Sequence, residues 1–128
     1  MKKQVTKKMI SAMRNAAFES LKSNFTKEEW DSFFAGGLVE IYLIKAYDNK
    51  NTYYTFLSYG SQINSANLEN YGLSKNGTYE ILGMVNKQTK TFTPTMEKIT
   101  ATDRKNYKDP FSLEEFKKFL DEISETNN

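Results

Sequence analysis

Two pairs of strand-like segments constrain the fold of this 128-residue chain more than any other feature. The first pair runs from Leu38 to Tyr47 and from Thr52 to Tyr59, with the polar residues Asp48 to Asn51 between them. The second pair runs from Thr78 to Asn86 and from Thr89 to about Ile99. β-branched and aromatic runs joined by short polar links predict β-hairpins, and hairpins build antiparallel sheets. We therefore expect a sheet of about four strands.

Three positions around the second pair refine this expectation. Asn76-Gly77 is a strong turn signal directly before its first strand. Gly83 lies inside that strand and indicates a β-bulge, because glycine adds no side chain to pack. Pro94 cannot donate a hydrogen bond to a sheet ladder, so its strand is expected at an edge.

Helical patterns precede the sheet. Residues Lys2 to Asn24 predict one helix, because apolar side chains recur on one stripe at helical spacing. Thr26 and Glu29 then match a capping box that opens a short helix, and Gly36-Gly37 is expected to end it. The apolar stripe consists of Val5, Met9, Ile10, Met13, Ala16, Ala17 and Leu21.

Two further helical segments are expected after the first hairpin. Residues Ser65 to Tyr71 predict one or two helical turns, and Gly72 ends them. Ser112 and Glu115 repeat the capping-box pattern and open a last helix that is expected to end near Ser124.

The order of these elements predicts an α+β fold in a single domain, residues 1–124, followed by a disordered tail at residues 125–128. The antiparallel sheet is packed by an N-terminal helix pair and a C-terminal helix. The simplest arrangement places the helices on one face of the sheet.

Charge is distributed unevenly along the chain, although the net charge is only +2. Residues 1–25 hold six lysine or arginine residues and one acid, Glu19, whereas the chain from Phe111 onward holds five acids and two lysines. This pattern favours terminal helices that lie together and neutralise each other.

No apolar run is long enough for a membrane span or a secretory signal, so cytoplasmic residence is expected. Abundant lysine, asparagine, phenylalanine and tyrosine is typical of AT-rich coding sequences from low-GC bacteria and their mobile elements.

The chain contains no histidine and no cysteine. Catalysis by Ser-His and Cys-His pairs and the usual zinc sites are therefore excluded. Three acidic residues lie on expected strands and could meet across the sheet as a functional group: Glu40, Glu80 and Glu97. Acidic residues are also usual at solvent-facing strand positions, which is the alternative interpretation. The sequence contains no phosphate-binding glycine loop and no nucleophile elbow, so we expect no enzyme, no cofactor and no metal.

Two basic clusters give nucleic-acid binding as the alternative function. Lysine and arginine side chains surround one aromatic residue opposite the apolar stripe of the first helix, and a second cluster follows the last strand. Such surfaces contact phosphates while an aromatic ring stacks on bases. The residues of this hypothesis are Lys7, Arg14, Phe18, Lys22, Arg104, Lys105 and Lys108.

A threonine face on the expected edge strand gives the leading hypothesis. Thr89, Thr91, Thr93 and Thr95 alternate, so they share one side of that strand. Such a face is the natural solvent side of an amphipathic strand, and exposed edges also accept partner strands. With Phe18, these threonines form the predicted partner-binding surface.

These patterns predict a small non-enzymatic intracellular binding protein that acts by protein–protein contact, as an inhibitor, adaptor or regulator. Small proteins of this kind occur in phages and plasmids, where some act on host defence systems.

Overall fold

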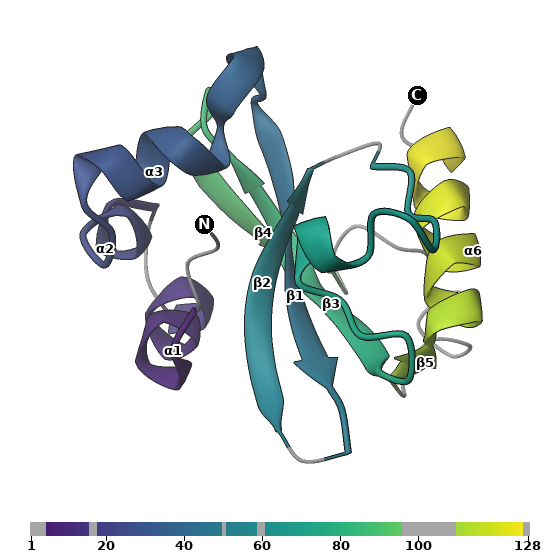
Figure 1. Cartoon of the computed structure of the whole chain (residues 1–128). Helices are drawn as coiled ribbons and strands as arrows, with labels where there is room; N and C mark the ends of the chain where they lie inside the picture. The colour runs from purple at the N-terminus through teal and green to yellow at the C-terminus, as the bar shows by residue number, and fades with distance from the viewer. Residues whose placement is uncertain (1–4, 16–17, 50, 59–60, 96–109, 127–128) are drawn as a thin grey trace.

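An antiparallel sheet forms the middle layer of the computed structural model, which describes residues 5–15, 18–49, 51–58, 61–95 and 110–126 (Figure 1). The strands lie in the order β2-β1-β3-β4, and β5 pairs with β3 as well. This arrangement confirms the predicted α+β fold with an antiparallel sheet built from two hairpins. The strands are β1 (Glu40–Tyr47), β2 (Thr52–Ser58), β3 (Thr78–Asn86), β4 (Thr91–Pro94) and β5 (Phe111–Ser112).

Helical layers cover both faces of this sheet (Figure 1). Three helices lie on one face: α1 (Lys7–Asn15), α2 (Phe18–Lys22) and α3 (Lys27–Phe33), followed by the 3₁₀ turn η1 (Ala35–Gly37). The helix α6 (Leu113–Thr126) and the 3₁₀ turn η2 (Glu69–Tyr71) lie on the other. The expectation of helices on a single face is therefore wrong, and the terminal helices do not neutralise each other because the sheet separates them.

The central strands require this double cover because both of their faces are apolar. In β1, Ile41 and Leu43 pack with the helices α1 to α3, whereas Tyr42 and Ile44 pack on the α6 side. Side chains alternate along a strand, so an unbroken apolar run puts apolar groups on both faces.

Two hydrophobic cores result, one on each face. The N-terminal core contains Val5, Met9, Ile10, Phe18, Leu21, Phe25, Trp30, Phe34, Ile41, Leu43, Tyr54, Leu82 and Val85. The C-terminal core contains Tyr42, Ile44, Ala46, Leu57, Leu73, Tyr79, Ile81, Met84, Phe111, Leu113, Phe116, Phe119 and Leu120.

A β-bulge in β3 divides its residues between the two cores. Leu43 pairs with Gly83 and the next residue, Ile44, pairs with Ile81, so Leu82 is the extra residue. The bulge lies where Gly83 predicted it. A Cβ at Gly83 would lie 2.6 Å from the Phe92 ring and 2.6 Å from the Thr93 carbonyl oxygen, so glycine lets β4 approach closely.

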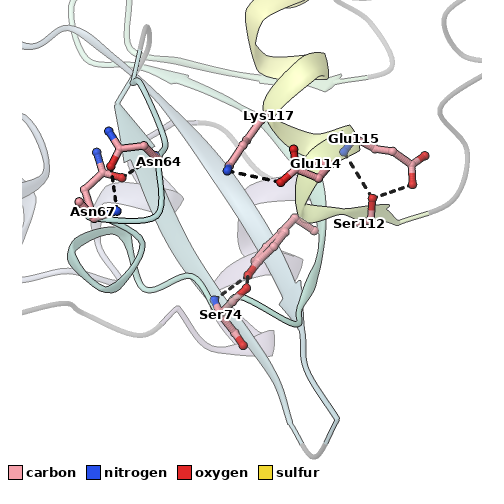
Figure 2. A network of polar contacts seen from close by, with 9 residues as sticks. Asn64, Asn67, Ser74, Ser112, Glu114, Glu115 and Lys117 are labelled. Carbon is pink, nitrogen blue, oxygen red and sulfur yellow. Dashed lines mark hydrogen bonds and ion pairs between the residues drawn. The ribbon is translucent and has the colours of Figure 1, made fainter.

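Local helix signals are confirmed in most places. Thr26 Oγ1 accepts from the Glu29 N–H at 3.1 Å, and Glu29 Oε1 accepts from the Thr26 N–H at 3.0 Å. Ser112 Oγ accepts from the Glu115 N–H at 3.3 Å at the start of α6 (Figure 2). That helix reaches Thr126, two residues beyond the expected end near Ser124, so Glu125 and Thr126 of the expected tail are helical. Residues 127–128 lie outside the described residues.

Within the N-terminal helical region, Phe18 departs most from expectation. One helix is expected over Lys2 to Asn24; its described helical parts are α1 (Lys7–Asn15) and α2 (Phe18–Lys22), and residues 16–17 between them lie outside the described residues. Phe18 is 7% exposed, and its ring meets Trp30 edge-on at 5.3 Å between centroids. The ring therefore belongs to the N-terminal core, where aromatic burial stabilises the fold, and not to the face opposite the apolar stripe.

Candidate functional site at the sheet edges

Among the described strands, β4 and β2 lie at the two ends of the sheet path. Pro94 of β4 pairs with Gly83 although it has no N–H. The backbone N–H and C=O groups of successive residues point to opposite sides of an antiparallel strand. The groups of Thr91 and Thr93 point towards β3, and the N–H and C=O of Phe92 and the C=O of Pro94 point away from it. Phe92 therefore supplies the outward N–H of this four-residue strand.

The predicted threonine face is only partly formed. Thr89 and Thr91 are exposed, and their hydroxyl oxygens lie 2.8 Å apart. Thr89 belongs to the turn before β4, and Thr93 is half-buried opposite Met84. Thr95 follows the strand, and its hydroxyl donates to the Ile81 carbonyl at 2.7 Å.

The expected strand from Thr89 to Ile99 is thus too long. Thr89 and Lys90 belong to the turn before β4, and β4 itself ends at Pro94. Residues 96–99 lie outside the described residues. The structure brings Thr89 and Thr91 together, and the role of all four threonines in partner binding stays a prediction.

The opposite edge strand, β2, directs more backbone hydrogen-bonding groups away from the sheet than β4 does. The Tyr54 carbonyl accepts from the Val5 N–H at 3.4 Å, and the Ser58 carbonyl accepts from the Ser61 N–H at 3.1 Å. Both carbonyls therefore face away from β1. By alternation, the backbone groups of Thr52 and Phe56 face the same way.

Aromatic rings lie beside this edge of β2. Phe56 is 4.2 Å from Phe33 and 5.8 Å from Phe25 between ring centroids, and Phe25 is 5.2 Å from Phe33. Phe25 is buried, whereas Phe33 and Phe56 are half-buried. We call these three residues the edge aromatic cluster. The sequence analysis did not single out these three rings, because they come from separate elements that only the fold brings together.

A polar cluster lies on the α1 to α3 side of the sheet. The Tyr47 hydroxyl donates to Glu80 Oε1 at 3.0 Å, and Lys45 Nζ lies 5.1 Å from the Tyr47 ring centroid. A hydrogen bond to the Tyr47 side chain raises the pKa of Lys45, and burial raises the pKa of Tyr47. Both groups therefore stay protonated at neutral pH, which favours a structural role over general-base or amine chemistry.

The three glutamates singled out above are not brought together where the structure describes them. Glu40 pairs with Asn86 and accepts from its Nδ2 at 3.1 Å, while Glu80 pairs with Lys45. Glu40 and Lys45 are five positions apart on β1, a span of about 17 Å. Glu97 lies outside the described residues. Within the described part of the chain, no three histidine, cysteine, aspartate or glutamate side chains form a group that could hold a metal ion.

The basic ridge expected on the first helix is also not formed as predicted. Lys7 and Lys22 are exposed, but they lie on the separate helices α1 and α2, and Phe18 between them is buried. Phe18 is thus a core residue, and the expectation of its exposure, on which both binding hypotheses drew, is wrong. The Arg14 side chain and the residues Arg104, Lys105 and Lys108 lie outside the described residues.

Tyr79 ties the loop before β3 to the C-terminal core. Its hydroxyl donates to the Ser74 carbonyl and accepts from the Ser74 N–H at 2.6 Å (Figure 2). The ring is fully buried and lies 5.0 Å from the Phe116 ring centroid. Burial raises the pKa of Tyr79 to about 12.

This raised pKa predicts an alkaline loss of stability. The unfolded chain releases the Tyr79 proton near the ordinary pKa of 10.0, whereas the folded chain holds it to about 12. The contribution of Tyr79 is therefore complete below pH 10 and falls by about 3 kcal/mol as the pH rises to 12. Urea unfolding across this range should show a steeper loss for the wild type than for Tyr79→Phe. Equal slopes of unfolding free energy against pH in the two proteins would contradict the assignment. The contributions of the other tyrosines are the same in both proteins and cancel in the comparison.

Comparisons with known proteins assign no relative: no protein-family model matches the chain, and no curated protein or solved structure is significantly similar to it. In the residues that the structure describes, no helix has the length and apolar character needed to cross a membrane.

Proposed function

We propose that this protein is a small intracellular binding protein, not an enzyme, that acts by protein–protein contact as an inhibitor, adaptor or regulator. The observation that carries the proposal is the outward-facing backbone of Thr52 and Phe56 in β2, beside the edge aromatic cluster, whereas the outward carbonyls of Tyr54 and Ser58 already accept from Val5 and Ser61. An exposed strand edge accepts an extended segment of another chain through main-chain hydrogen bonds, and adjacent side-chain pockets supply specificity.

The geometry of β2 defines the partner segment. Phe56 directs its backbone away from β1 and its side chain towards Phe33 on the α1 to α3 side. An added strand would place alternate side chains on that same side. The partner is therefore an extended segment with an apolar or aromatic residue that packs against Phe33 and Phe56.

The β4 edge is the weaker acceptor of the two. It is four residues long, ends in Pro94 and directs one N–H outward, at Phe92. Short edge strands with proline are a common way for proteins to block strand addition. Thr89 and Thr91 remain candidates for side-chain contacts at this end of the sheet.

A pair of substitutions at Thr52 tests the β2 edge. Thr52→Pro removes an outward N–H at the first residue of the strand, where proline is tolerated. Thr52→Ala removes the same hydroxyl and keeps the N–H. We expect Thr52→Pro to weaken partner binding about fivefold, the effect of roughly 1 kcal/mol of hydrogen-bond free energy, and Thr52→Ala to bind normally.

The measurement is affinity capture from the native host with all three chains, read by mass spectrometry and by nucleic-acid sequencing. Equal capture by the wild type and a folded Thr52→Pro variant would contradict the β2 proposal. Loss of capture in Thr89→Ala/Thr91→Ala would move the contact to β4. Recovery of nucleic acid instead of protein, lost in Lys7→Ala/Lys22→Ala and steeply salt-dependent, would favour the alternative function.

A further inference from the structure

The turn from Ser74 to Gly77 contains an exposed asparagine directly before a buried glycine. The Gly77 N–H donates to the Ser74 carbonyl at 3.1 Å, and the Asn76 N–H donates to Ser74 Oγ at 3.3 Å. The same Ser74 carbonyl accepts the Tyr79 hydroxyl, while the Ser74 N–H donates to that hydroxyl at 2.6 Å. Tyr79 thus fixes Ser74 by two hydrogen bonds, and the Ser74 carbonyl in turn accepts from the Gly77 amide.

This pair of residues can undergo a spontaneous reaction. The backbone nitrogen of Gly77 loses its proton and attacks the side-chain amide carbon of Asn76, forming a C–N bond as ammonia leaves. The five-membered succinimide then takes up water, and opening of either C–N bond yields aspartate or isoaspartate. Glycine favours the attack because it has no side chain to hinder the approach of its nitrogen.

We propose that Asn76 is a deamidation site whose rate is set by the Tyr79–Ser74 contact. The attacking nitrogen is occupied as a donor as long as the Ser74 carbonyl stays in place. Tyr79, anchored in the C-terminal core against Phe116, fixes that carbonyl. Loosening of this core therefore exposes Asn76 to modification, and the native packing protects it.

Modification is expected to act back on the fold. Isoaspartate lengthens the backbone by one carbon within the turn. The turn has little room for this, because a Cβ placed on Gly77 would lie 2.7 Å from Tyr79 Oη and 3.0 Å from the Tyr47 carbonyl oxygen. The modified turn would have to separate from Tyr79, which loosens the start of β3.

The experiment incubates the full-length chain in mildly alkaline buffer and follows deamidation of the peptide that carries Asn76 by mass spectrometry. We expect the folded wild type to react more slowly than the same chain unfolded in urea. Tyr79→Phe should react about fivefold faster than the wild type, as loss of roughly 1 kcal/mol of hydrogen-bond free energy implies. Tyr53→Phe is the matched control, because Tyr53 is half-buried and packs against the same core.

A folded Tyr79→Phe variant that reacts at the wild-type rate would overturn the proposal, as would a folded wild type that reacts as fast as the unfolded chain. If Tyr79→Phe does not fold, amide hydrogen exchange of Gly77 in the wild type decides the question. Protection of that amide supports the proposal, and exchange at the unprotected rate refutes it.

Discussion

Phe18→Ala is expected to destabilise the protein by about 3–5 kcal/mol, the usual cost of truncating a buried phenylalanine. The ring fills the N-terminal core edge-on to Trp30, and the sheet residues Ile41 and Leu43 close the same core. Alanine would leave a cavity between α2 and the sheet. Urea unfolding measures the loss as a lower midpoint at an unchanged slope.

Lys22→Ala is the control for this prediction, because Lys22 is exposed on the same short helix. Its expected effect is within about 0.5 kcal/mol. If Phe18→Ala cost no more than Lys22→Ala, the Phe18 ring would lie on the surface, and its original assignment to partner binding would return.

Phe116→Ala is expected to have a similarly large effect, about 3–5 kcal/mol, on the other face of the sheet. Phe116 is 0% exposed and packs against the Tyr79 ring in the C-terminal core. Loss of the ring removes one of the contacts between α6 and the sheet and leaves Tyr79 without this aromatic neighbour. Thermal unfolding followed by near-UV circular dichroism, which reports on tyrosine packing, measures the effect.

Lys118→Ala on the exposed side of α6 is the matched control and should be nearly neutral. A small loss for Phe116→Ala would mean that α6 contributes little to stability and that the C-terminal core is not a second core. A large loss in both phenylalanine variants would show that both cores contribute to the free energy of unfolding.

The elements predicted best are those whose signals are local. The β3 strand has the expected limits, Thr78 to Asn86, and the bulge at Gly83 and the capping box at Thr26 lie where the sequence indicates them. Pro94 lies in an edge strand, as its missing N–H requires. In each case the physical cause is a hydrogen bond or a steric requirement within a few residues.

The errors concern contacts between distant residues. The burial of Phe18 depends on Trp30, which lies on another helix, and no helical periodicity within residues 2–24 indicates it. The double cover of the sheet follows from packing on two faces of β1, which an apolar run also permits in other arrangements. The threonine alternation was correctly read, but the tight turn at Thr89 and Lys90 and the strand end at Pro94 leave only Thr91 and Thr93 on the strand.

The candidate site shows the same division. The sequence by itself determined that an edge strand would exist, that histidine and cysteine chemistry is impossible, and that aromatic side chains are abundant. Only the tertiary structure decided which edge turns its hydrogen-bonding groups outward and which aromatic rings lie beside it. The reason is that the direction of a backbone group depends on pairing between strands, and the edge aromatic cluster forms when Phe25, Phe33 and Phe56 from three parts of the chain meet.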